Sequence, residues 1–363
     1  MDVELLIIGG GPAGLSAAVE AVRYGVDTLL VDDGPELGGQ LIKQTHKFFG
    51  SKMEYAGKRG IEIPALILDQ IRQAPNFRFM SRTTALGYYE DGAVIVVKDE
   101  KVKVIYPKRI IVATGASEKI IPFKNNDIPG VYGAGAVQTL MNVYGVLPGK
   151  RALMVGAGNI GLIVSYQLLQ AGCDVAAIVE ATSAVGGYWV HAAKVRRMGV
   201  PILTEHTIVE AIGKTQVEGA TIARIDKNFK PVSGTEKRID CDIICLAVGL
   251  SPLVDFLFYA GCRMVYIPEL GGEVPTRTEE METSVKGIYV AGDASGIEEA
   301  SSAMLEGRLA GLSAALSLGY TIPDFEDRKS EILKELENLR KAPVAYKVSI
   351  GLNKLKEHKN ARP

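Results

Sequence analysis

Short hydrophobic runs alternate with glycine-rich turns and polar segments along this chain, and one order of elements occurs twice. The first run, Leu5–Ile8, is followed by a helical pattern over about residues 12–24 and a strand-like run over 28–31. The second copy starts with the run Ala152–Val155 and continues through a helix to the run Val175–Val179. Strands that alternate with amphipathic helices are typical of parallel α/β sheets, so the pattern predicts two such units.

A glycine-rich turn stands between strand and helix in both copies. The turns are Gly9–Gly14 and Gly156–Gly161, and an acidic residue follows them after 18 residues (Asp32) and 19 residues (Glu180). In such units glycine lets the backbone approach a pyrophosphate, the helix N-terminus offers free N–H groups, and the acid accepts from ribose hydroxyls. Two turns in matching context predict two dinucleotide sites, and hence a flavoprotein that exchanges electrons with a second nucleotide-bearing partner.

Alternating segments in each half predict an antiparallel meander beside the sheet. In the first half these segments lie around residues 77–81, 93–97 and 102–106, and in the second half over about 202–225. Apolar strands over 109–113 and 243–248 then lead into glycine turns.

The last third of the chain returns to the plan of the first half. Residues 287–291 predict a buried strand, and a helix of small residues is predicted from 300 to about 318. Beyond Pro323 a charged amphipathic helix follows, and a short tail without a motif ends the chain. The apolar face of that helix is marked by Ile332, Leu333, Leu336 and Leu339.

Composition narrows the function classes. The 363 residues are 47% hydrophobic and carry a net charge of −1, which gives no reason to expect nucleic acid or an anionic membrane as partner. No apolar run reaches the roughly 18 residues of a membrane helix, so the protein is expected to be soluble and cytoplasmic. From Lys341 onward six Lys/Arg stand against one acid, which fits either a solvated terminus or a docking surface for another subunit.

The four cysteines, Cys173, Cys241, Cys245 and Cys262, show neither a CxxC motif nor metal-ligand spacing. We expect buried, inert thiols and no metal site.

Further motifs make the chain resemble a known superfamily. Together with the two turns, Gly38-Gly39-Gln40, Ala113-Thr114-Gly115 and Ala291-Gly292-Asp293 resemble the two-dinucleotide-binding-domain flavoproteins of the pyridine-nucleotide-disulfide oxidoreductase superfamily, over about residues 3–320. The resemblance implies that Asp293 lies at the ribityl or pyrophosphate part of FAD. It also implies that the helix beginning near Ala300-Ser301 points its N-terminus at the flavin pyrimidine edge, where its dipole stabilises negative charge.

One departure from that superfamily bears on function. Thioredoxin reductases carry a redox CxxC before the second glycine turn, and glutathione reductases carry a cysteine pair after the first nucleotide unit. Neither 130–139 nor 38–42 contains cysteine here, and thiol–disulfide exchange needs two juxtaposed thiols, so the chain is not expected to be a disulfide reductase.

A narrower resemblance fits better. Segments 128–138, 177–181 and 295–300 resemble the FAD subunits of opine oxidase, hydrogen cyanide synthase, heteromeric sarcosine oxidase and dye-linked proline dehydrogenase. This resemblance implies a second flavoprotein subunit that dehydrogenates an amine, amino acid or hydroxy compound. Many such subunits add a cysteine-rich iron–sulfur module. The Lys-rich end here has no cysteine, so any such centre is expected either on a partner, such as a small cysteine-rich companion, or to be missing.

The predicted fold is α/β, with two Rossmann-like three-layer domains that each carry an antiparallel meander. A discontinuous FAD-binding domain (1–118 and 251–325) holds an inserted NAD(H)-type domain (119–250), and a charged helix and tail (326–363) follow. The predicted FAD-binding residues are Gly9, Gly11, Pro12, Ala13, Gly14, Asp32, Asp33, Gly39, Gln40, Ala113, Thr114, Gly115, Gly292, Asp293, Ala300 and Ser301. Those of the second site are Gly156, Gly158, Asn159, Ile160, Gly161, Glu180 and Gly249.

The second nucleotide is predicted to be NAD(H), because a 2′-phosphate would sit against the Glu180 carboxylate. A tightly bound adenine nucleotide such as ATP, or an empty site, is the alternative, and Arg196 and Arg197 lie too far along their helix to argue for NADP(H). Lys43 and His46, in the polar loop that continues through Phe48-Phe49-Gly50-Ser51, are the candidates for groups beside the flavin.

The predicted function is an FAD-dependent oxidoreductase that passes electrons between FAD and NAD(H), as one component of a heteromeric dehydrogenase. A stand-alone NADH oxidase or diaphorase, and a scaffold in which both nucleotides are structural, are the competing hypotheses. The sequence leaves the organic donor open.

Overall fold

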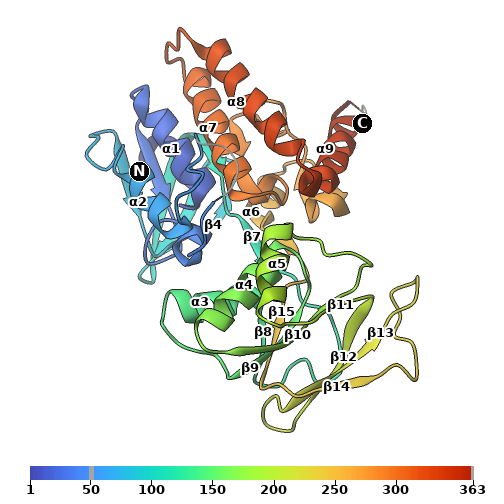
Figure 1. The fold of residues 1–363 in the computed structure, drawn as a ribbon. Coiled ribbons are helices and arrows are strands. Elements are labelled where there is room, and N and C mark those ends of the chain that lie inside the picture. The colour runs from blue at the N-terminus through green and yellow to red at the C-terminus, as the bar shows by residue number, and fades with distance from the viewer. Residues whose placement is uncertain (49–52, 361–363) are drawn as a thin grey trace. The chain divides into compact units, whose positions relative to one another are not determined.

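The computed structural model describes residues 1–48 and 53–360 and divides the chain into two compact units (Figure 1). Unit 1 comprises Met1–Ser117 and Ser251–Pro363, and unit 2 comprises Glu118–Leu250. The chain passes between them at β7 (Ala116–Glu118) and β16 (Leu250–Pro252), which form a two-stranded sheet.

A parallel sheet in the order β3-β2-β1-β6, with β19 also paired to β6, is the centre of unit 1. Its strands are β1 (Asp2–Ile8), β2 (Thr28–Val31), β3 (Phe77–Met80), β6 (Lys101–Val112) and β19 (Ile288–Val290). The first half of β6 pairs antiparallel with β5 (Val94–Lys98), which pairs with β4 (Thr83–Tyr88), and these three strands form the meander.

Two predictions for this sheet were wrong. Residues 77–81 do not belong to the meander, because β3 pairs parallel to β2. Segments 102–106 and 109–113 are one strand, β6, whose end is buried as Ile110–Val112 while its beginning is exposed. The beginning of β6 therefore lies in a meander that is open on one face, and its end lies in a parallel sheet that is covered on both faces.

Helices α1 (Pro12–Arg23) and α7 (Ala300–Ser317) pack together on one face of this sheet. A Cβ on Gly307 would lie 2.0 Å from the carbonyl oxygen of Ala13, and one on Gly311 would lie 2.3 Å from that of Ala17. The two backbones are thus in direct contact. Helix α8 (Phe325–Arg340) lies over α7 and buries Ile332 and Leu336, as its predicted apolar face requires.

The other face of the sheet packs against the meander and the short helix α6 (Asp255–Tyr259) through Leu6, Ile8, Ile105 and Phe256. The remaining elements of unit 1 are α2 (Ile63–Leu68), β17 (Met264–Ile267), β18 (Gly272–Pro275) and α9 (Tyr346–Asn360), with 3-10 turns at Gly39–Lys43, Gly60–Glu62, Pro268–Leu270, Gly292–Ser295 and Pro343–Ala345.

The last helix corrects the expectation of a motif-free, solvated tail. In α9, Leu352 and Leu355 pack against Ile267 and Leu270, and the Lys354 ammonium lies 2.6 Å from the Glu269 carboxylate. Burial of the two leucines orders this segment in spite of its lysines.

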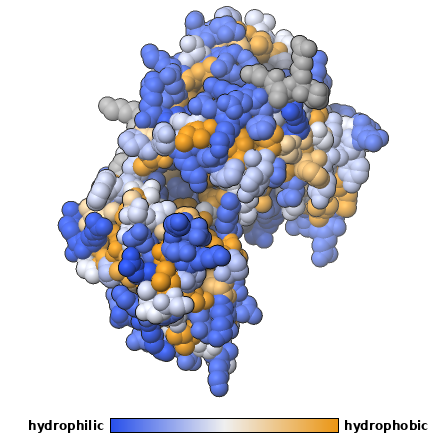
Figure 2. Space-filling model, turned by 90° about the vertical axis from the view of Figure 1, so that its right-hand side faces the viewer, coloured by the Kyte–Doolittle hydropathy of each residue, from blue (hydrophilic) through white to orange (hydrophobic). Residues whose placement is uncertain are grey.

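Among residues 1–48 and 53–360, no helix is long and apolar enough to cross a membrane. Figure 2 shows hydrophobic patches interspersed with hydrophilic side chains on the surface.

Unit 2 is built on a parallel sheet in the order β11-β10-β9-β15-β8. The strands are β8 (Val131–Gly133), β9 (Arg151–Val155), β10 (Asp174–Glu180), β11 (Ile202–Thr204) and β15 (Ile243–Leu246), and the helices are α3 (Ala134–Asn142), α4 (Asn159–Gln170) and α5 (Trp189–Arg197). An antiparallel meander, β12 (His206–Ile212), β13 (Gly219–Arg224) and β14 (Lys237–Ile239), completes the unit.

The predicted second meander over 202–225 was wrong at its start, because β11 pairs parallel with β10. Strand β8 and helix α3 were not predicted. The Glu118 carboxylate accepts the Gly135 N–H (2.6 Å) and the Ala136 N–H (3.2 Å) at the beginning of α3. An acid 17 residues upstream thus supplies the N-terminal cap.

Substituting Gly307→Ala should push α7 away from α1, because the new Cβ meets backbone that has no alternative rotamer. We expect a fall in melting temperature of about 5 °C or more, the size of an overpacking penalty. Gly87→Ala in β4 is the matched control, since its Cβ meets nothing closer than a Tyr89 ring carbon at 3.9 Å. Equal melting temperatures for the two variants would contradict the close contact.

Candidate functional site

The first glycine-rich turn lies at the carboxyl end of β1. Gly9 has φ +103°, and a Cβ there would lie 2.2 Å from the Ala113 carbonyl oxygen; a Cβ on Gly14 would lie 1.8 Å from that of Gly9. The Gly9 N–H donates to the Val31 carbonyl (2.8 Å) and ties the turn to β2. Glycine is required at both positions because backbone occupies the side-chain space.

The end of this turn is open. Gly11, the residue before α1, has extended backbone (φ −75°, ψ −169°) with no side-chain cap, and Pro12 follows it. A Cβ on Gly11 would meet nothing closer than the Gly39 Cα at 3.8 Å. Uncapped N–H groups at a helix start, next to free space, suit a phosphate group. The residues present therefore fit a dinucleotide.

Of the two predicted acids at the end of β2, Asp32 belongs to the turn. Its carboxylate accepts the Gly10 N–H (2.6 Å) and the Gly34 N–H (2.8 Å), whereas Asp33 is exposed. The turn, the helix start and the acid thus form one connected structure.

The second turn repeats this geometry in unit 2. Gly156 has φ +107°, and its Cβ would lie 2.2 Å from the Ala247 carbonyl oxygen; that of Gly161 would lie 2.1 Å from the Gly156 oxygen. Gly158 has the backbone of Gly11 (φ −74°, ψ −178°), with nothing within 4 Å of a Cβ.

The acid of the second turn is held like the first. The Glu180 carboxylate accepts the Ala157 N–H (2.7 Å) and the Thr182 N–H (2.9 Å), as Asp32 accepts from Gly10 and Gly34. Both acids are therefore oriented by the turn whose ligand they would contact.

A glycine pair follows each acid, and this repeat is not among the predicted features. Gly38-Gly39 begins six residues after Asp32, and Gly186-Gly187 begins six residues after Glu180. The Gly38 N–H donates to the Gly10 carbonyl (2.8 Å), and the Gly187 N–H donates to the Ala157 carbonyl (3.1 Å). The equal spacing is a signal in the sequence, but of these four glycines only Gly39 is among the predicted site residues.

The two sites differ at the helix start. Ala13 is 5% exposed because α7 covers it, whereas Ile160 is 40% exposed. The Asn159 side-chain oxygen accepts the Tyr188 N–H (2.8 Å), which places the beginning of α5 beside the second turn. Trp189 follows, 76% exposed, with the Arg196 guanidinium 5.9 Å from its ring centre.

A third segment, Gly292-Asp293, reaches the first turn. Gly292 has φ +70°, and a Cβ there would lie 2.9 Å from the Ala13 Cβ. The Asp293 carboxylate accepts the Glu298 N–H (3.3 Å), and burial, together with the nearby Glu306 and Glu298 charges, raises its pKa to about 7. Helix α7 begins at Ala300, after Glu299 in an extended conformation, and Ser301, its second residue, is buried.

The other predicted residues have varied surroundings. A Cβ on Gly39 would lie 2.8 Å from the Gly11 Cα, so the turn that carries Gln40 starts against the first site. Of the other residues predicted for the FAD site, Thr114 donates its hydroxyl to the Leu253 carbonyl (2.6 Å), and Gly115 beside it has φ +77°. Gly249, predicted for the second site, is exposed and has φ +119°.

The candidates beside the flavin lie in the loop after that turn. Lys43 is partly buried, and the His46 ring stacks on Phe48 at 5.9 Å. The rest of the predicted loop, Phe49 to Ser51, lies outside the described residues. Among the described residues no group of His, Cys, Asp and Glu could hold a metal ion.

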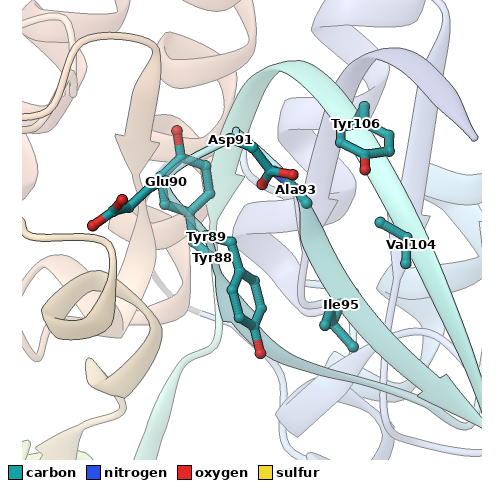
Figure 3. A pocket seen from close by; sticks show the side chains of 8 residues that line it. All are labelled: Tyr88, Tyr89, Glu90, Asp91, Ala93, Ile95, Val104 and Tyr106. Atoms are coloured by element: carbon teal, nitrogen blue, oxygen red, sulfur yellow. The ribbon is translucent and has the colours of Figure 1, made fainter.

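A pocket on the meander, lined by both polar and apolar side chains, is separate from these turns (Figure 3). It is lined by Tyr88, Tyr89, Glu90, Asp91, Ala93, Ile95, Val104 and Tyr106. Tyr106 pairs with Asp2 at the amino end of β1, whereas the glycine turn follows the carboxyl end. Ligands of parallel sheets bind at carboxyl ends, so we do not assign this pocket to a nucleotide.

Comparisons with known proteins agree with this geometry. The family model for pyridine nucleotide-disulphide oxidoreductases matches residues 3–307. The sarcosine oxidase alpha chain of Rhizobium meliloti (strain 1021) is 29% identical over 88% of the present chain and 31% of its own length. The opine oxidase A polypeptide of the same strain is 27% identical over 88% of the present chain and 72% of its own length. The present chain spans about a third of the sarcosine oxidase polypeptides that it matches.

The L-proline dehydrogenase of P. horikoshii has the same fold, with a TM-score of 0.72 and 25% identity over 93% of this chain and 59% of that one. The predicted fold class and the resemblance drawn from the motifs are therefore confirmed. This chain belongs to the pyridine nucleotide-disulphide oxidoreductase family, whose members are FAD-dependent oxidoreductases that bind FAD and NAD(H).

Proposed function

We propose that unit 1 binds FAD, that unit 2 binds NAD(H), and that the chain passes electrons between them as one component of a heteromeric dehydrogenase. The observation that carries this proposal is the geometric match of the two turns. Each has a glycine pressed against backbone, an open helix start and an acid held by two backbone N–H groups. A turn without a ligand would not need the open helix start in both units.

In unit 1, the open N–H groups after Gly11 would hold the FAD pyrophosphate and Asp32 the ribose hydroxyls. Gly292-Asp293, against Ala13, would hold the next part of the cofactor, and the start of α7 would present its positive dipole end. When bound, FAD supplies two-electron redox chemistry, and the protein supplies position and electrostatics.

In unit 2, Glu180 favours an unphosphorylated ribose and therefore NAD(H) over NADP(H). The Arg196 guanidinium lies over the Trp189 ring, 5.9 Å from its centre, which directs its charge to an aromatic ring. A bound adenine nucleotide such as ATP would use the same turn and acid, and it remains the alternative for this site.

The cysteines argue against disulfide chemistry. All four are buried and free. Burial raises the pKa of the Cys173 thiol to about 11 and that of Cys241 to about 12, and it also raises the pKa values of Cys245 and Cys262. Thiols that stay protonated and enclosed cannot attack a disulfide.

The relatives support a partner protein. The matching polypeptides of sarcosine oxidase, opine oxidase and hydrogen cyanide synthase are each named as one subunit of an enzyme. We propose that a second flavoprotein oxidises an amine, amino acid or hydroxy compound, and that a small cysteine-rich iron–sulfur protein completes the complex.

Substituting Asp32→Ala should weaken FAD binding about 10-fold or more, since the variant lacks the carboxylate that would accept hydrogen bonds from the ribose hydroxyls. Asp33→Ala, at the exposed neighbour, is the matched control and should retain its flavin. The measurement is the FAD dissociation constant of each apoprotein, from quenching of flavin fluorescence. Equal constants for the two variants would argue against the assigned role of Asp32.

Anaerobic mixing of the FAD-loaded chain with NADH should bleach the flavin band near 450 nm rapidly, and Glu180→Ala should slow the bleaching at limiting NADH. NADPH should be the poorer reductant because its 2′-phosphate faces Glu180. A chain that keeps its FAD but is bleached by neither nucleotide would instead favour a structural nucleotide in unit 2.

A thiol reagent at pH 8 should modify fewer than one of the four cysteines in the native chain and all four after unfolding. Ser183→Cys, at an exposed position, is the control and should add one fast-reacting thiol. Rapid modification of a native cysteine would reopen the possibility of thiol chemistry.

A further inference from the structure

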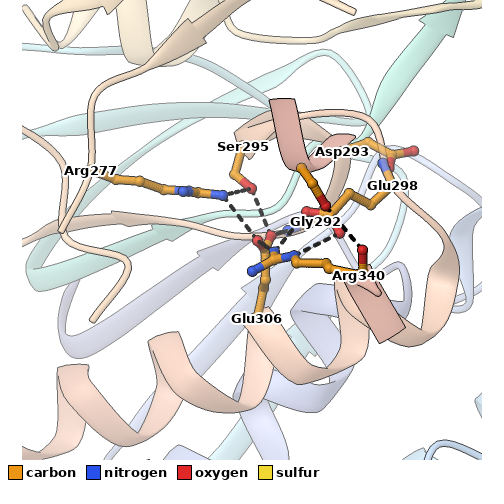
Figure 4. A network of polar contacts seen from close by, with 8 residues as sticks. Arg277, Gly292, Asp293, Ser295, Glu298, Glu306 and Arg340 are labelled. Carbon is orange, nitrogen blue, oxygen red and sulfur yellow. Dashed lines mark hydrogen bonds and ion pairs between the residues drawn. The ribbon is translucent and has the colours of Figure 1, made fainter. Parts of the chain in front are cut away.

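A buried carboxylate lies under the Gly292-Asp293 segment. The Glu306 side chain on α7 is 3% exposed and accepts the Gly292 N–H (3.1 Å) and the Ser295 hydroxyl (2.6 Å). It also accepts from the Arg277 guanidinium (3.0 Å) and the Arg340 guanidinium (2.8 Å), as Figure 4 shows. One buried side chain therefore fixes the backbone of a segment that contacts the first glycine turn.

Arg340 joins this carboxylate to a second one. Its guanidinium donates through Nε (3.0 Å) and a terminal nitrogen (2.7 Å) to the two oxygens of Glu298, which is 7% exposed. A planar guanidinium is suited to such a two-pronged bond while it reaches a further carboxylate. Arg340 is thus the cation shared by Glu298 and Glu306.

Acids already outnumber cations around this segment, and the loss of Arg340 would widen the difference. Asp293, Glu298 and Glu306 supply three carboxyl groups, and Arg277 and Arg340 supply two guanidinium groups. Without Arg340 the segment would hold three buried or half-buried acids beside one cation. Since an uncompensated buried charge is costly, the acids would protonate or the segment would move.

Arg340 comes from a part of the chain outside the family match. It is the last residue of α8, whereas the matched region ends at residue 307 within α7. Its carbonyl accepts the Ser349 hydroxyl of α9 (3.0 Å), and Ile332 and Leu336 anchor α8 to the core. The C-terminal helices therefore deliver one specific charge to the Gly292-Asp293 segment.

We propose that Arg340 is a positioning residue of the flavin site: by neutralising Glu298 and Glu306 it holds Gly292, Asp293 and the start of α7 in the geometry that binds FAD. The inference rests on the proposed binding of FAD by unit 1. It makes α8 part of the cofactor site, and it makes a cation at position 340 a determinant of FAD affinity and of the flavin reduction potential.

The experiment compares Arg340→Met with Lys341→Met in the full-length chain. Lys341 is the next residue, and it pairs with the exposed Glu337 on the surface. We expect the FAD dissociation constant of Arg340→Met to rise at least 10-fold and its flavin reduction potential to fall, with both values unchanged in Lys341→Met. Arg340→Lys should lie between, because an ammonium cannot bond both carboxylates with the same geometry.

A double variant tests the electrostatic reason. Glu298→Gln with Arg340→Met removes one acid together with the cation, so it should recover most of the FAD affinity lost in Arg340→Met. A double variant no better than the single one, or an Arg340→Met chain that binds FAD within twofold of the parent, would overturn the inference. If Arg340→Met does not fold, Arg340→Lys and the double variant decide by the same criteria.

The parent chain separates the two proposals. A parent that binds no FAD would refute the proposed function, and this inference with it. A parent that binds FAD, together with an affinity indifferent to position 340, would refute the inference alone.

Discussion

Direct backbone contact at two glycine turns determines how this structure is built around its two candidate nucleotide sites. At Gly9 and at Gly156 the space of a side chain is taken by the carbonyl oxygen of a neighbouring strand, 2.2 Å away in each case. Any other residue would separate the strand ends from the helix start. Because the contact holds each helix N-terminus at the carboxyl ends of its sheet, it also determines where a phosphate can bind.

The two units differ in how far the helix start after the glycine turn is covered. In unit 1, α7 covers the first turn so closely that Gly307 and Gly311 lie against the α1 backbone, and a buried ion network supports the segment before α7. In unit 2 the helix start is more open, with Ile160 and Trp189 exposed. This contrast favours the proposal that unit 1 retains its cofactor and that unit 2 exchanges its nucleotide.

The acidic side chains of the sites also differ in where their hydrogen-bond partners come from. Asp32 and Glu180 are satisfied by backbone N–H groups within their own turns, so each acid is oriented before any ligand arrives. Glu306 instead depends on two arginines distant in sequence. The geometry of each turn is therefore local, whereas the contacts under the Gly292-Asp293 segment include Arg340 from the end of helix α8.

The amino-acid sequence by itself predicts the two turns, their acids and the order of strands and helices around them. It also shows the lack of a redox cysteine pair. These features are local: a glycine at a positive φ, or an acid at a strand end, is visible in a few consecutive residues. The three-dimensional fold was needed to place β3 and β11 in the parallel sheets, to order α9, and to bring Arg340 to Glu306. Strand pairing and long-range ion pairs depend on which distant segments meet, and a short stretch of sequence does not encode that.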